Sequence, residues 1–136
     1  HGKLFNEAAD FMGTNVIIRT MEIGLFIFFI IHIIQGLLLT ASNAAKRGIP
    51  YEKNYGSRGS TWYSRSMGLL GTLVLLFLIV HLSNFWFPSR WHQVPEFKPL
   101  ASDNIADLFG LMKKTFANPF IVLIYILGCI SLAYHL

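Results

Sequence analysis

The sequence predicts an all-α fold, a transmembrane helix bundle, from its composition and from the distribution of its charges. Of the 136 residues, 54% are hydrophobic and only 13% are charged, and the mean hydropathy is +0.51. Soluble domains carry about 25% charged residues. Three stretches contain no Asp, Glu, Lys or Arg: 23 residues at 23–45, 24 residues at 66–89 and 22 residues at 115–136. Each is close to the roughly 20 residues that a helix needs to cross a hydrocarbon core of about 30 Å.

The same composition excludes a soluble enzyme, a nucleic-acid-binding module and a domain built on disulfides. The formal net charge of +4 comes from basic residues in the polar segments beside the apolar stretches, where loop charge bias explains them. We therefore expect membrane lipids, and no nucleic acid, as partners. The single cysteine, Cys129, can form neither an internal disulfide nor the C-x-x-C-H of covalent haem attachment. We interpret it as a packing residue.

The first half of the chain is expected to contain two spans. Residues 1–20 have apolar side chains that recur on one face, which predicts an interfacial helix or loop. The first span follows at about 21–40. The polar connection 41–66 contains one proline and three glycines, which forbid a continuous helix. The second span covers about 67–87 and is expected to end at Pro88.

The second half is expected to contain a surface helix and a third span. Ser102 is a suitable N-cap, and lysines occupy the last turn of a segment that predicts an interfacial helix over about 103–114. The third span covers 119–136, with a proline at its first position. We treat residues 1–136 as a single membrane-anchor domain. Because no initiating Met precedes it and no stop signal follows the last span, we expect a fragment of a longer membrane protein.

The basic residues of the connections predict the orientation in the membrane. The connection 41–66 carries five basic residues against one acidic residue, and the connection 89–118 carries four against three. Cytoplasmic loops carry the excess of Lys and Arg, so we expect 41–66 on the cytoplasmic side. Trp86 and Trp91 then lie at the outer membrane interface, and Trp62 lies at the inner one.

Each apolar stretch contains one histidine: His32, His81 and His135. A polar side chain in hydrocarbon needs a partner, so such residues are candidates for function. Counting from the middle of each span places His32 and His135 at a similar depth on the cytoplasmic side. His81 lies roughly 7 Å toward the outer face at about 1.5 Å per residue. We therefore expect His32 and His135 to pair and His81 to need a different partner.

Two neutral imidazoles on facing helices are what a six-coordinate haem iron requires besides its porphyrin. Gly36 and Gly128 lie near these histidines and leave room either for a flat ring or for close helix packing. A zinc site would need further ligands, and no Asp or Glu lies in the core of any span, which also argues against a proton pump. Two alternatives remain open. One is a haem-free anchor or assembly protein whose histidines bond neighbouring helices, and the other is a fragment of a small-solute transporter.

Four groups of residues occur in a defined order. They are His32-Ile33-Ile34-Gln35-Gly36; Ser64-Arg65-Ser66-Met67; His81-Leu82-Ser83-Asn84-Phe85-Trp86; and Phe116-Ala117-Asn118-Pro119 with Tyr125 and His135-Leu136. Together they resemble the cytochrome b subunit of succinate dehydrogenase and fumarate reductase. The closest likeness is to the five-helix, two-haem type of menaquinone-using bacteria, and it covers essentially the whole chain as helices two to four of five.

The resemblance implies a non-catalytic electron-transfer subunit in the bacterial cytoplasmic (inner) membrane, part of a complex of the tricarboxylic acid cycle. Such a subunit anchors a flavoprotein subunit and an iron–sulfur subunit, relays electrons between the latter and menaquinone, and has no dicarboxylate site. By the resemblance, His32 and His135 are the axial ligands of the haem b nearer the iron–sulfur subunit. His81 is one ligand of a second haem, whose other ligand is a histidine on a first helix that this sequence lacks.

Three further residues are candidates for binding groups of the haem or the quinone. Haem propionates need cationic partners, and we expect Arg65 and Lys46, at the cytoplasmic rim, to supply them. Quinone reduction needs proton exchange near the outer haem. We expect Glu7, which precedes the first span on the outer side, to line the quinone site.

Overall fold

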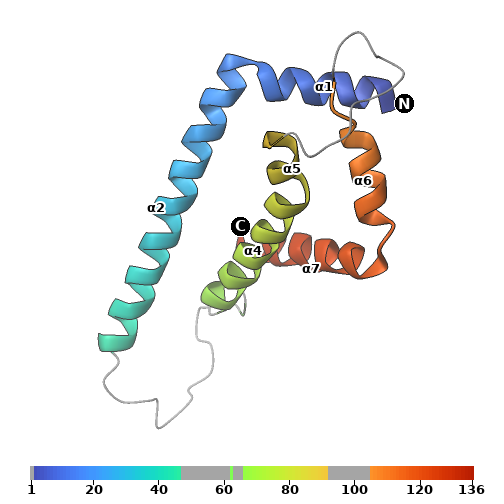
Figure 1. The fold of residues 1–136 in the computed structure, drawn as a ribbon. Coiled ribbons are helices and arrows are strands. Elements are labelled where there is room, and N and C mark those ends of the chain that lie inside the picture. Colours follow the sequence, from blue (N-terminus) through green and yellow to red (C-terminus); the bar gives the residue numbers. More distant parts are fainter. Residues whose placement is uncertain (1, 47–61, 63–65, 92–104) are drawn as a thin grey trace.

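The computed structural model describes residues 2–46, 62, 66–91 and 105–136, and its elements in these ranges are helices (Figure 1). They are α1 (Gly2–Thr14), α2 (Val16–Lys46), α4 (Met67–His81), the π-helix η1 (Leu82–Trp86), α5 (Phe87–Arg90), α6 (Leu108–Phe116) and α7 (Pro119–His135). Two segments, α2 and the run from α4 to α5, are long and apolar enough to cross a membrane. A third candidate is α6 with α7, which are bent by 97°. The chain is therefore an all-α membrane protein with two to three spanning helices.

α1 and α2 meet at a corner at Asn15, and α1 lies across one end of the bundle (Figure 1). The Asn15 Oδ1 accepts hydrogen bonds from the backbone N–H groups of Ile17 at 2.9 Å and Ile18 at 3.3 Å. These are amides that have no partner inside α2, so Asn15 is its N-cap. Because of this cap, the helix begins before residue 21, where the first span was expected to start.

The second span continues through Pro88 to Arg90, although the sequence predicts an end at the proline. A proline inside a helix lacks an N–H donor, and its ring crowds the carbonyl four residues earlier. Here the preceding turn is a π-helix, in which the N–H of Phe87 donates to the carbonyl of Leu82. The wider turn accommodates the proline. Trp86, the last residue of this π-helix, and Arg90 of α5 both contact Glu22 of α2.

The surface helix between the second and third spans is α6, which begins later than the expected residue 103. Its N-cap is Asp107, whose side chain accepts a hydrogen bond from the backbone N–H of Gly110 at 3.0 Å. The expected cap, Ser102, lies outside the described residues. Two lysines occupy the last turn of α6, where they interact favourably with the helix dipole.

α4 packs mainly against α7, which begins at Pro119, the first residue of the expected third span. At their crossing, a Cβ on Gly128 would lie 2.3 Å from the Phe77 ring. Gly128 therefore allows close helix packing, one of the two roles that the sequence left open. Gly36 has no neighbouring atom within 4 Å of its Cβ position.

Candidate functional site

The structure brings together two of the expected ligands, His32 of α2 and His135 at the end of α7. The centroids of their imidazole rings are 5.9 Å apart, and the ring planes are inclined at 77°. The two residues are 103 positions apart in the sequence. This contact therefore depends on the arrangement of the helices and joins α2 to α7.

The separation of the rings fits a single iron between them. A metal–imidazole bond is about 2 Å long, so two imidazoles on opposite sides of one iron have ring centroids roughly 6 Å apart. The Nδ1 atom of His135 is buried and has no hydrogen-bond partner among the described residues. Leaving a buried nitrogen without a hydrogen-bond partner is costly. These residues thus fit a haem held by two histidines.

Gly71 of α4 provides space for the imidazole of His135. A Cβ at this position would lie 3.1 Å from Cε1 of His135 and 3.7 Å from its Nδ1. The His135 ring therefore packs directly on the α4 backbone, which limits its movement. The sequence alone does not reveal this role, because Gly71 and His135 belong to different spans and no local motif links them.

No group of three or more His, Cys, Asp and Glu side chains that could hold a metal ion occurs in the described part of the chain. A haem iron takes four ligands from the porphyrin and needs only two from the protein, so this finding does not bear on a haem between His32 and His135.

His81 lies apart from this pair, among aromatic side chains at the end of α4. Its ring centroid is 6.1 Å from that of Phe77, 5.7 Å from that of Phe85 and 6.0 Å from that of Tyr125. The Asn84 amide donates a hydrogen bond to the Tyr125 hydroxyl at 3.2 Å. This bond holds η1 against α7 and fixes the aromatic surroundings of His81.

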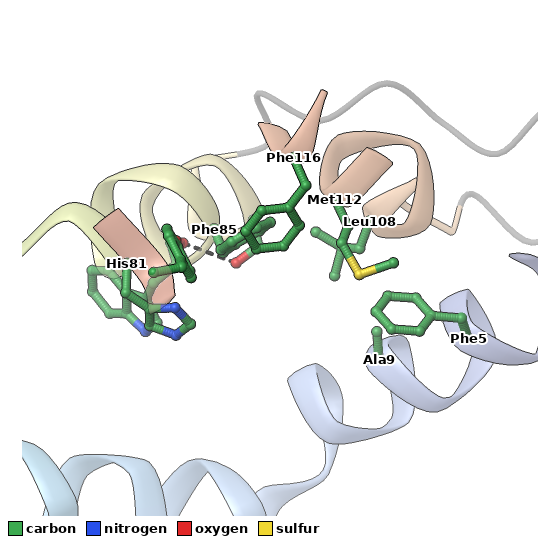
Figure 2. A pocket seen from close by; sticks show the side chains of 10 residues that line it. Phe5, Ala9, His81, Phe85, Leu108, Met112 and Phe116 are labelled. Carbon is green, nitrogen blue, oxygen red and sulfur yellow. Dashed lines mark hydrogen bonds between the residues drawn. The ribbon is translucent and has the colours of Figure 1, made fainter. Parts of the chain in front are cut away.

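His81 lines an apolar cavity of about 450 Å³ between α1, α6 and the end of the second span. Figure 2 shows His81 at one end of this cavity and Phe5, Ala9 and Met112 at the other. Its volume lies in the range of roughly 300–1,000 Å³ that is typical of small-molecule sites. The cavity can therefore accept a flat, apolar ligand beside the histidine.

His81 also lines a larger cavity of about 1010 Å³ between α1, α2 and the second span. Leu25, Phe29 and Leu78 supply apolar walls. Charged side chains, among them that of Glu22 in α2, form the polar end of this larger cavity. The two cavities meet at His81, which lines both of them. Trp86 and Ser89 also line both cavities.

The polar end of the larger cavity contains the Glu22 bridge, formed by Glu22, Trp86 and Arg90. The Glu22 carboxylate accepts hydrogen bonds from Nη2 of Arg90 at 2.6 Å and from the indole N–H of Trp86. Arg90 Nη1 also donates to the carbonyl of Gly13 in α1 at 3.2 Å. The Trp86 ring packs on Phe26 with centroids 5.2 Å apart. Glu22 and Arg90 each border a charge-free stretch of the sequence, but nothing local predicts their pairing.

Of the three other expected site residues, the structure describes the surroundings of Glu7 alone. Glu7 forms an exposed ion pair with Lys3 at 3.7 Å, and it is not among the residues that line the two cavities. Lys46 is the last residue of α2, and Arg65 lies outside the described residues. The expected quinone role of Glu7 and the expected propionate roles of Lys46 and Arg65 stay predictions.

The fold and the site define an all-α membrane protein in which histidines from two helices meet beside a glycine of a third. Comparison with known protein families, curated proteins and solved structures finds no match. The function is therefore inferred from the residues of the chain itself.

Proposed function

We propose that this chain is the haem b-binding membrane anchor of a succinate:quinone oxidoreductase, which relays electrons between an iron–sulfur subunit and menaquinone. The contact between His32 and His135, with ring centroids 5.9 Å apart, is the observation that supports this most strongly. When bound, haem supplies one-electron redox chemistry. The two imidazoles hold the group between α2 and α7, while Gly71 keeps the ring of His135 in place. Dicarboxylate chemistry belongs to the flavoprotein partner.

A second haem and the quinone bind near His81 in this proposal. Gly71, which contacts His135, is ten residues from His81 on the second span, or about 15 Å along the helix axis at about 1.5 Å per residue. The cavity of about 1010 Å³ supports a haem with His81 as one ligand. Its other ligand comes from a histidine of a further helix. The apolar cavity of about 450 Å³ supports a quinone ring next to it.

The proposed orientation follows from the basic residues of the connections. In a bacterial inner membrane, the connection 41–66 faces the cytoplasm, because it has the larger excess of basic residues. His32 and His135 then lie nearer the cytoplasm than His81 does. The iron–sulfur and flavoprotein subunits dock on that side, so the histidine pair lies between the iron–sulfur subunit and His81.

The reduced-minus-oxidised absorption spectrum of the purified full-length protein tests the proposal. We expect a low-spin b-type signal, and we expect His32→Ala and His135→Ala each to remove the contribution of one haem. Gln35→Ala changes a polar residue one turn from His32 on α2 and should leave the spectrum intact. A colourless protein, or a signal that neither histidine variant reduces, would refute the proposal. A haem-free anchor or a small-solute transporter would then be the better interpretation.

A further inference from the structure

α2 contacts the rest of the bundle at two separate places. Among the described residues, hydrogen bonds, ion pairs and ring contacts join α2 to α4, α5, η1 or α7 only in the following groups. They are the Glu22 bridge, the Phe26–Trp86 ring contact and the His32–His135 ring contact. None of the apolar window of this span is buried. Glu22 and His32 are ten residues apart, so the two attachments are about 15 Å apart along the helix. Among the described residues, very few side chains therefore fix the orientation of α2.

The Glu22 bridge is well suited to fix that orientation. Only 19% of the Glu22 side chain and 23% of the Arg90 side chain are exposed, and their closest atoms are 2.6 Å apart. Hydrogen bonds between charged groups are roughly twice as strong as neutral ones. Without Glu22, the poorly solvated charge of Arg90 loses its acidic partner and keeps the carbonyl of Gly13. Without Arg90, Glu22 keeps a longer ion pair of 3.8 Å with Arg19 of the same helix. By contrast, the Lys3–Glu7 pair lies within one helix and is 59% and 41% exposed, so it contributes little to the arrangement of helices.

The bridge also connects four elements, α1, α2, η1 and α5. Arg90 donates to the carbonyl of Gly13 in α1 as well as to Glu22 in α2. Trp86 and Arg90 lie on either side of Pro88, Trp86 at the end of the π-helix and Arg90 in α5. Both donors converge on the single carboxylate of Glu22. A change in the tilt of α2 would break both hydrogen bonds together.

We propose that Glu22 is a positioning residue for the histidine pair. By binding Arg90 and Trp86, it fixes the tilt of α2 so that His32 meets His135. α2 is one helix of 31 residues, so a rotation at the bridge displaces His32 as well. The consequence for haem rests on the function proposed above, but the consequence for the position of α2 does not.

Pulsed EPR distances in the full-length protein test the position of α2. One spin label is placed on the exposed Cys129 of α7, and the other on a cysteine introduced at Leu38 of α2, which is 64% exposed. We expect one narrow distance in the parent protein. Glu22→Gln should broaden and shift it, and so should Arg90→Gln. The change in the double variant should be smaller than the sum of the two single changes, because the two residues share one interaction. Lys3→Gln, which breaks the exposed ion pair, should leave the distance unchanged.

The EPR signal of the ferric haem tests the effect on the ligands, because its g-values depend on the angle between the two axial imidazole planes. We expect Glu22→Gln to shift this signal and Lys3→Gln to leave it unchanged. If Arg90→Gln does not accumulate, Arg90→Lys replaces it, since lysine keeps the charge but loses the planar fork of donors.

Each failure has a separate meaning. Unchanged label distances in Glu22→Gln and in the Arg90 variant would overturn the positioning role, whether or not haem is bound. A changed distance with an unchanged haem signal would overturn the link from Glu22 to the histidine pair. A parent protein without haem would overturn the proposed function, and the label distances would still decide the role of Glu22.

Discussion

Replacing Gly71 with alanine is the smallest change that reaches the histidine pair. The new Cβ would lie 3.1 Å from Cε1 of His135, closer than the optimal carbon–carbon contact of about 3.5–4.0 Å. A free imidazole can move by a few tenths of an ångström, but an imidazole bound to iron cannot do so without distorting the bond. The cost therefore falls mainly on the haem-bound state. Overpacking of this kind costs about 1–3 kcal/mol, which corresponds to roughly 5- to 150-fold weaker haem binding.

The assay is titration of haem into the haem-depleted protein, followed by absorbance. Gly68→Ala is the matched control, because it makes the same substitution one turn earlier on α4 and no atom lies within 4 Å of its Cβ position. We expect Gly68→Ala to bind haem like the parent and Gly71→Ala to bind it more weakly. Equal affinities for the two variants would show that the ring of His135 is not held against α4 when haem is bound.

Three further predictions concern the packing that supports the site. Gly128→Ala would place a Cβ 2.3 Å from the Phe77 ring and separate α4 from α7. We expect the free energy of unfolding in detergent to fall by about 1–3 kcal/mol. An unchanged free energy of unfolding would contradict the close crossing of the two helices. Asn6 is 0% exposed and donates a hydrogen bond to Asp107 at 2.9 Å. Asn6→Ala should therefore lower the free energy of unfolding by about 1–3 kcal/mol and speed amide hydrogen exchange in α6. Unaltered exchange in α6 would argue against this link between α1 and α6. Asn118→Ala removes the N-cap of α7 and should lower the free energy of unfolding by about 1 kcal/mol. Amide hydrogen exchange should become faster only in the first turn of α7. Exchange as slow as in the parent in this turn would rule out the cap.

Two of the three expected spans coincide with helices long and apolar enough to cross a membrane. They could be predicted because a membrane imposes two simple constraints, a minimum apolar length and the absence of charge. The ends of the spans could not be predicted as well. The start of α2 depends on the Asn15 cap, and the end of the second span depends on the π-helix that accommodates Pro88. Both are local backbone solutions that a count of apolar residues does not reveal.

The meeting of His32 and His135 could be expected because the fixed rise of a helix gives the depth of each residue in the membrane. Depth alone does not give the direction in which a side chain points or the neighbour it meets. Gly71 and the pairing of Glu22 with Arg90 depend on the crossing and rotation of the helices, which long-range packing determines. Their roles therefore emerge only from the three-dimensional structure.

The central claim is that His32 and His135 bind one iron from opposite sides, and chemical rescue tests it most directly. His32→Gly and His135→Gly each leave a space that free imidazole can fill, and the haem spin state is followed by absorbance in the full-length protein. We predict that each variant loses the low-spin signal of one haem and that added imidazole restores it. A low-spin signal as large as that of the parent in either variant without imidazole would contradict the claim.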